Sequence, residues 1–202
     1  QGSPAFDDQQ LHGRGQNVLS MLRRWQQEKQ SKHRFDFVLQ GLQAAFPKLT
    51  DIGFDGAGNV LTARVYHQGV EHPAPLAHEA NGVLQMLVLL ANVAQADPGG
   101  VVAIDEPENG LHPYAMRMFL RSCQQWALKY QVTFVLATHS LVLLDEFTGT
   151  PEAVFVMKAL DDSDVGTVPN TLDQLCDRDW LEGFKLGDLY EQGEIGSNDD
   201  GQ

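Results

Sequence analysis

Residues 101–113 read Val-Val-Ala-Ile-Asp-Glu-Pro-Glu-Asn-Gly-Leu-His-Pro. Small and β-branched apolar residues fill the first four positions, and two adjacent carboxylates, Asp105 and Glu106, follow at once. A short, continuous apolar run is typical of a strand covered on both faces of a parallel sheet. Ligands of such sheets bind at the carboxyl ends of the strands. The stretch therefore predicts a buried strand that carries an Asp–Glu pair to a ligand-binding edge.

The two carboxylates suit the chemistry of phosphoryl transfer. Asp105 can hold Mg²⁺, because this ion prefers a few carboxylates together with water and substrate phosphates. Side chains alternate along a strand, so Glu106 is expected to point elsewhere and can orient an attacking water. The alternative is that both residues only cap the helix that follows. The pair alone does not decide between these roles.

The flanking sequence predicts further strands and helices. After the strand at 101–104, apolar strands are expected at 133–137 and 153–158, with helices at 114–129 and 141–147 between them. Strands that alternate with helices in this way predict an α/β fold with a mainly parallel sheet flanked by helices.

The triplet Thr138-His139-Ser140 follows the second of these strands. A right-handed crossover brings the ends of two parallel strands together, so His139 is expected at the same edge as Glu106. There it can donate a hydrogen bond to a γ-phosphate and help to hold the attacking water. The alternatives are that His139 caps the next helix or packs in the core.

The N-terminal part of the chain predicts a helical lobe with a small β-hairpin. Asn17 is expected to cap the first helix. The last helix of this part is apolar on nearly all sides, so it should be buried. The expected elements are helices at 17–30 and 35–46, strands at 52–54 and 60–66 around a loop at 55–59, and a helix at 83–94.

Composition limits the class of protein. Hydrophobic residues make up 43% of the 202 residues, which excludes disorder over most of the chain. The net charge of −13 disfavours a broad nucleic-acid interface, because phosphate binding depends on Lys and Arg. A local basic patch remains open, against the alternative of a solvated helix face; it comprises Arg23, Arg24, Lys29, Lys32 and Arg34.

The sequence also bears on the cellular setting. Cys123 and Cys176 have no metal-binding or redox spacing. The sequence has no recognisable signal peptide and no apolar run long enough to span a membrane. We expect a cytoplasmic protein without a membrane partner.

Two motifs together resemble a known family. Residues 104–113, with the Asp–Glu pair, and the stretch Ala137-Thr138-His139-Ser140 are similar to the C-terminal half of a soluble ABC-type ATPase. The resemblance is strongest to the AAA-family branch that groups with the RecF, SMC and OLD-type proteins, often called AAA_21-like. It implies a P-loop NTPase fold of the ABC type, with ATP and Mg²⁺ as cofactors.

The resemblance also implies residue roles. The Asp–Glu pair occupies the place of the Walker B motif, in which Asp105 would hold Mg²⁺ and Glu106 would polarise the attacking water. His139 occupies the place of the switch histidine, which senses the γ-phosphate. The stretch after the pair resembles the D-loop, whose residues serve structure or the subunit interface; they are Asn109, Gly110, Leu111 and His112.

Ala80, Asn81 and Gly82 occupy the position of the family's signature motif. At that position a glycine-containing turn presents backbone N–H groups and a helix N-terminus to the nucleotide of a partner subunit, which implies a homodimer. The family's usual serine is Ala80 here, so the signature lacks a hydroxyl and is degenerate.

Composition and the family resemblance together predict four parts in the chain. A flexible segment at 1–15 precedes a helical lobe with a β-hairpin at 16–75. The C-terminal ATPase core, with signature, Walker B, D-loop and switch histidine, is expected at 76–160. An acidic, loop-rich tail is expected at 161–202.

The phosphate-binding loop of such an ATPase reads Gly-x-x-x-x-Gly-Lys-Ser/Thr. No lysine of this chain follows a glycine; the lysines are Lys29, Lys32, Lys48, Lys129, Lys158 and Lys185. The loop is therefore expected upstream in a longer protein or on another chain, unless it has been lost. An N-terminal, P-loop-bearing half is the expected partner.

Three functions are compatible with the sequence. The first is the C-terminal part of an ABC-type protein that binds and hydrolyses ATP, a part that is inactive by itself. The second is a non-catalytic assembly or regulatory module without its own nucleotide site. The third is an OLD-type nuclease, which is disfavoured because too few residues follow Lys158 for the nuclease domain. The sequence does not identify a nucleic-acid or effector partner.

Overall fold

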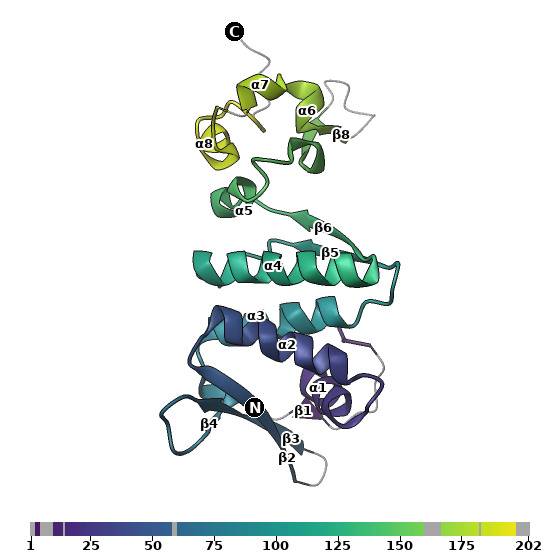
Figure 1. Cartoon of the computed structure of the whole chain (residues 1–202), viewed down its shortest axis with the longest axis vertical. Helices are drawn as coiled ribbons and strands as arrows, with labels where there is room; N and C mark the ends of the chain where they lie inside the picture. The colour runs from purple at the N-terminus through teal and green to yellow at the C-terminus, as the bar shows by residue number, and fades with distance from the viewer. Residues whose placement is uncertain are drawn as a thin grey trace. The chain divides into compact units, whose positions relative to one another are not determined.

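The computed structural model of the chain, drawn in Figure 1, describes residues 3–4, 10–13, 15–57, 60–159, 167–181 and 183–196. It divides into two compact units, Gln1–Ala137 and Thr138–Gln202. Parts of the segments predicted at 1–15, 55–59 and 161–202 lie outside the described residues.

Helices form the core of the first unit. In Figure 1, α4 lies between α2 and α3 on one side and the strands β5 and β6 on the other. Met86, Leu90 and Phe119 are fully buried between these layers, so the predicted burial of α3 is confirmed. No helix in the described part of the chain is both long and apolar enough to cross a membrane. The bounds are α1 Val18–Gln27, α2 Lys32–Ala45, α3 Asn81–Ala94, α4 Pro113–Tyr130, β5 Val101–Asp105 and β6 Thr133–Ala137.

The start of α1 differs from the prediction. Asn17 occupies the N-cap position, but its side chain makes no capping hydrogen bond to the helix. Instead its Oδ1 accepts from the His12 N–H at 2.8 Å, and its amide donates to the Gln10 carbonyl at 2.7 Å. Asn17 is only 1% exposed, so it fastens the preceding loop to the buried start of the helix.

An antiparallel sheet packs beside the helices of the first unit. Its strands are β1 Ser3–Pro4, β2 Leu49–Ala57, β3 Val60–His67 and β4 Ala74–Pro75. The strand order is β1-β3-β2, and β4 also pairs with β3. Burial alternates along β3, with Leu61, Ala63 and Val65 inside, which confirms the predicted one-sided strand. The strand β2 continues to Ala57, so residues 55–57, which were expected in a loop, belong to a strand.

The strands β5 and β6 form a parallel pair in register, from Val101 opposite Thr133 to Asp105 opposite Ala137. The predicted parallel arrangement of these two strands is confirmed. Their burial was expected on both faces, and this expectation is wrong for the described chain. Val102 is buried on the face toward α4, whereas Val101 and Val135 are 67% and 55% exposed on the other face.

The second unit contains a short antiparallel pair and several short helices. The strand expected at 153–158 begins at Phe155, and it does not extend the parallel sheet. It pairs antiparallel with β8, from Phe155 opposite Thr171 to Ala159 opposite Thr167. The elements are α5 Leu141–Asp145, η2 Pro151–Ala153, β7 Phe155–Ala159, β8 Thr167–Thr171, α6 Leu172–Leu175, α7 Arg178–Leu181 and α8 Leu186–Glu191.

The segment predicted as a loop-rich tail has its own small core. Leu172, Leu181, Leu186, Leu189 and Ile195 are buried together, and partly buried side chains from this segment and from the residues before it pack against them. Buried leucines thus support three short helices in a region whose acidic composition suggested irregular structure.

Candidate functional site

Asp105 and Glu106 lie where β5 ends. Asp105 is the last residue of the strand, and the Glu106 N–H donates to the Ala137 carbonyl of β6 at 2.8 Å. Both side chains are exposed. Glu106 has a φ of +45°, a left-handed conformation that costs a non-glycine residue on the order of 1 kcal/mol. The chain therefore turns sharply at Glu106, directly beyond the paired strand ends.

A tight turn holds the Glu106 carboxylate. The Asn109 amide donates to Glu106 Oε2 at 2.6 Å, and the Asn109 N–H donates to the Glu106 carbonyl at 3.1 Å. The Leu111 N–H donates to the Glu108 carbonyl at 2.9 Å, and Gly110 has a φ of +77°. These bonds make the predicted D-loop a compact turn that fixes the carboxylate with one short hydrogen bond.

His112 ends this turn by capping α4. Its Nδ1 accepts from the Tyr114 N–H at 3.2 Å, and Pro113 occupies the first helical position. Because Nδ1 accepts here, the neutral ring carries its proton on Nε2. The helix is thus capped by His112, so the alternative that Asp105 and Glu106 serve as its cap is wrong.

The candidate signature residues begin α3. Ala80 is the N-cap, with a methyl side chain that makes no capping bond, and its carbonyl accepts from the Val83 N–H at 2.9 Å. Asn81 and Gly82 are the first residues of the helix. The N–H groups of a first helical turn have no intrahelical acceptor, and they carry the positive end of the helix dipole. This end of α3 can therefore receive an anion.

The signature turn and the D-loop lie against each other in the first unit. A Cβ added to Gly82 would lie 3.3 Å from the Gly110 carbonyl oxygen. Sequence reasoning placed each glycine in a motif but did not predict this contact. The one sequence feature that pointed to the contact is the glycine at both positions, because glycine permits close approach of two backbones.

A partly buried hydrogen bond lies directly before the signature residues. His67 Nε2 at the end of β3 lies 2.8 Å from Glu79 Oε1, and their side chains are 24% and 12% exposed. The hydrogen bond fastens Glu79, the residue before Ala80, to the hairpin sheet.

His139 belongs to the second unit, in the segment between β6 and α5. Its Nδ1 lies 2.8 Å from the Tyr190 hydroxyl, and its side chain is exposed. Ser140 caps α5 by accepting from the Leu143 N–H at 3.4 Å. Both structural alternatives for His139, a helix cap and a core residue, are therefore wrong.

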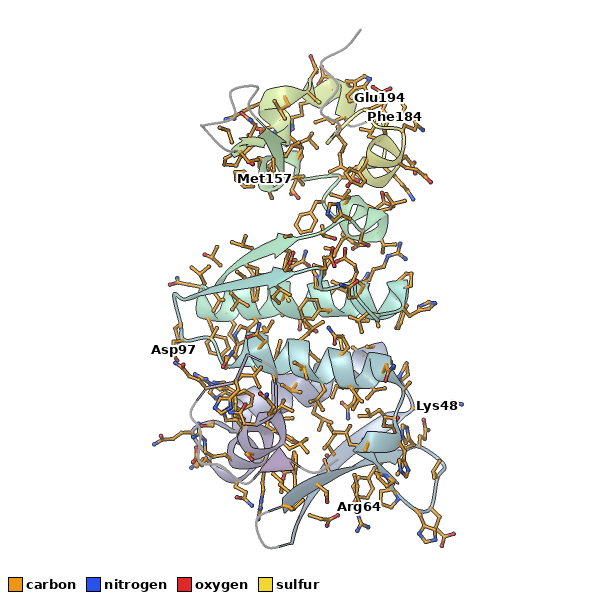
Figure 2. The ribbon with its side chains drawn as sticks, turned by 180° about the vertical axis from the view of Figure 1, so that it is seen from behind. Lys48, Arg64, Asp97, Met157, Phe184 and Glu194 are labelled. Carbon is orange, nitrogen blue, oxygen red and sulfur yellow. The ribbon has the colours of Figure 1, made fainter. Side chains whose placement is uncertain are left out.

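The basic patch predicted on the N-terminal helices borders a hollow of about 630 Å³ in the first unit. Arg34 there donates to the Gln95 carbonyl at 2.9 Å and forms an ion pair with Asp97 at 3.1 Å. Figure 2 labels Asp97 in the loop that follows α3. Because protein groups already engage Arg34, this hollow is a weak candidate for a phosphate site.

Comparison with known proteins bears on the site and the fold. The chain is 28% identical over 87 residues to the energy-coupling factor transporter ATP-binding protein EcfA1 of Methanospirillum hungatei. That stretch covers 43% of this chain but only 30% of the relative. Residues 7–145 match the family described as "AAA domain, putative AbiEii toxin, Type IV TA system". The predicted α/β, P-loop NTPase-like fold is thereby confirmed. The chain belongs to this AAA-domain family and carries an ABC/AAA-type ATPase domain.

Proposed function

We propose that this chain supplies the C-terminal half of a site that binds and hydrolyses ATP, with the phosphate-binding loop in another part of the complete ATPase. The observation that carries the proposal is the turn after β5. It begins at the exposed Asp105–Glu106 pair, and its backbone at Gly110 packs against Gly82 at the start of α3. Membership of the AAA-domain family supports ATP as the ligand.

Asp105 is the proposed Mg²⁺ ligand. Its carboxylate is exposed at the end of β5. Among the described residues, no group of three or more His, Cys, Asp or Glu side chains could hold a metal together. Mg²⁺ fits such a site, because it keeps several waters and takes one or two carboxylates plus phosphate oxygens. When bound, the ion neutralises charge that develops on the phosphates.

Glu106 is the proposed general base. Asn109 engages Oε2, which leaves Oε1 available to accept a hydrogen bond from an attacking water. A positioned carboxylate of this kind typically accelerates hydrolysis by about 10²–10⁴-fold. His139 is the proposed contact to the γ-phosphate, as in the switch position of the family that the sequence resembles.

The start of α3 is proposed to act in trans, on the nucleotide of a second subunit. Asn81 and Gly82 can present backbone N–H groups at the positive end of a 14-residue helix. Ala80 offers no hydroxyl, so recognition would depend on the backbone alone. This role implies a homodimer, with Asn109, Gly110, Leu111 and His112 near the interface.

The exposed face of β5 and β6 is proposed to receive the P-loop-bearing half. Parallel sheets are normally covered on both faces. Here Val101 and Val135 are more than half exposed on one face, while α4 covers the other. An apolar sheet face of this kind suits a partner that completes the ATPase core.

The test is Glu106→Gln in the complete ATPase, which contains this chain and its P-loop-bearing half. We expect ATP binding to persist and turnover to fall by at least about 100-fold, because the amide cannot accept a proton. Glu71→Gln, an exposed residue of the first unit, is the matched control. Unchanged turnover in Glu106→Gln would refute the proposed role.

A non-catalytic assembly module is the competing function, favoured by the absence of a lysine that follows a glycine. The two functions differ in one measurement. If the complete assembly binds ATP and its Glu106→Gln variant traps ATP without hydrolysis, the ATPase function holds. If the assembly contains no phosphate-binding loop and binds no ATP, the assembly module is correct.

A further inference from the structure

We propose that Tyr190, on the C-terminal helix α8, is a positioning residue for His139. The proposal rests on the proposed role of His139 toward the γ-phosphate. The Tyr190 hydroxyl lies 2.8 Å from His139 Nδ1, and the two ring centroids are 6.4 Å apart. Tyr190 lies beyond residue 145, where the family match ends.

The contact is built by the docking of α8 on α5. The Gly187 N–H donates to Asp145 Oδ1 at 3.0 Å, and the Leu186 N–H donates to Thr148 Oγ1 at 3.3 Å. Lys185 Nζ lies 3.7 Å from Asp145 Oδ2. The first turn of α8 is thus fastened at several points to α5 and the turn after it.

Two glycines permit the close packing that holds Tyr190. A Cβ on Gly187 would lie 2.7 Å from both Asp145 Oδ1 and the Leu141 carbonyl oxygen, so only glycine lets α8 approach α5 this closely. A Cβ on Gly196, whose φ is +80°, would lie 2.9 Å from the Tyr190 ring. The backbone at Gly196 therefore passes directly beside the ring.

The hydrogen bond links the Tyr190 hydroxyl to the tautomer of His139, because Nδ1 can accept from the hydroxyl or donate to it. When the Tyr190 hydroxyl donates to Nδ1, the neutral imidazole carries its proton on Nε2. That Nε2–H can then donate to a phosphate oxygen. Tyr190 thus favours the tautomer, and the ring orientation, that the proposed γ-phosphate contact requires.

Tyr190→Phe tests the inference, because it removes the hydroxyl and keeps the ring. In the isotope-labelled chain, we expect the ¹⁵N shifts of His139 to move from the Nε2–H form toward a tautomer mixture. In the complete ATPase, kcat should fall about fivefold with KM unchanged, because loss of one neutral hydrogen bond weakens the contact that His139 makes to the γ-phosphate in the transition state. Tyr66→Phe, on the exposed side of β3, should change neither quantity.

The outcomes separate this inference from the proposed function. His139→Ala assigns the NMR signals and should abolish most turnover; if turnover is unchanged, the proposed role of His139 fails. If His139→Ala is inactive but Tyr190→Phe retains wild-type turnover or wild-type ¹⁵N shifts, the positioning role of Tyr190 alone is overturned.

Discussion

Two side chains with proposed roles in ATP hydrolysis are held in different ways. Glu106, in the first unit, accepts a hydrogen bond from Asn109, three residues later in the sequence. His139, in the second unit, is bonded to Tyr190, 51 residues later, and depends on the docking of α8. The turn that contains Asn109 restrains Glu106 by itself. His139, in contrast, loses its hydrogen bond to Tyr190 when α8 separates from α5. Local unfolding therefore disturbs the position of His139 more readily than that of Glu106.

The largest expected difference between the two units is in thiol reactivity. Cys123 lies on α4, is 3% exposed, and has a thiol pKa that burial raises, so the reactive thiolate is scarce. Cys176, between α6 and α7, is only partly buried. We expect alkylation of Cys176 to be at least about 100-fold faster than that of Cys123 in the native chain. Peptide mass spectrometry of an iodoacetamide time course measures both rates.

Denaturant provides the control for the labelling experiment. In the unfolded chain the two thiols should react at similar rates, because burial no longer separates them. Equal rates in the native chain would contradict the difference in burial between Cys123 and Cys176.

The variant Gly187→Ala, with the next largest expected effect, tests how firmly α8 is docked on α5. Gly187→Ala places a methyl group 2.7 Å from two oxygens of the α5 segment, and overpacking of this kind costs about 1–3 kcal/mol. We expect amide hydrogen exchange in α8 to accelerate by roughly 30-fold and the His139–Tyr190 bond to weaken. Gly149→Ala is the matched control in the same unit, since no atom lies within 4 Å of its added Cβ. Unaltered exchange in Gly187→Ala would show that the docking is loose.

The variant Asn109→Ala tests the hydrogen bond that restrains Glu106. Loss of a hydrogen bond to a charged carboxylate should reduce kcat of the complete ATPase about tenfold, because Glu106 no longer holds a single orientation. The fold should be unaffected, since the Asn109 side chain is exposed. Gln124→Ala, exposed on α4, is the control. A larger loss of activity in Gln124→Ala than in Asn109→Ala would sink this explanation.

The first unit was the more predictable from sequence. The helices α3 and α4 and the strands β5 and β6 were placed to within two residues, because their apolar patterns are long or uninterrupted. The strand-end carboxylates followed from the same pattern. The bond between Asn109 and Glu106 did not, because hydrogen bonding within a turn depends on backbone angles such as the positive φ of Glu106.

The second unit was less predictable for a physical reason. An apolar run such as β7 indicates a strand but not its partner, and β8 contains Pro169, which is atypical of strands. The helices α6, α7 and α8 have four to six residues, too few for a helical period to be recognised. Tyr190 could not be paired with His139, because nothing in either local sequence indicates a contact across 51 residues.

The smallest expected effect is that of Gly82→Ala, the counterpart of Gly187→Ala in the first unit. Its added Cβ would lie 3.3 Å from the Gly110 carbonyl oxygen, so a shift of a few tenths of an ångström relieves the contact. Alanine also favours the helical conformation over glycine by up to about 1 kcal/mol, which offsets this strain. We expect the free energy of unfolding to change by less than about 0.5 kcal/mol, measured by urea denaturation. The D-loop has to shift to accommodate the methyl group. If Gly82→Ala destabilises the chain as much as Gly187→Ala does, this turn is as rigid as the α5–α8 contact. The expected difference between the two contacts would then be refuted.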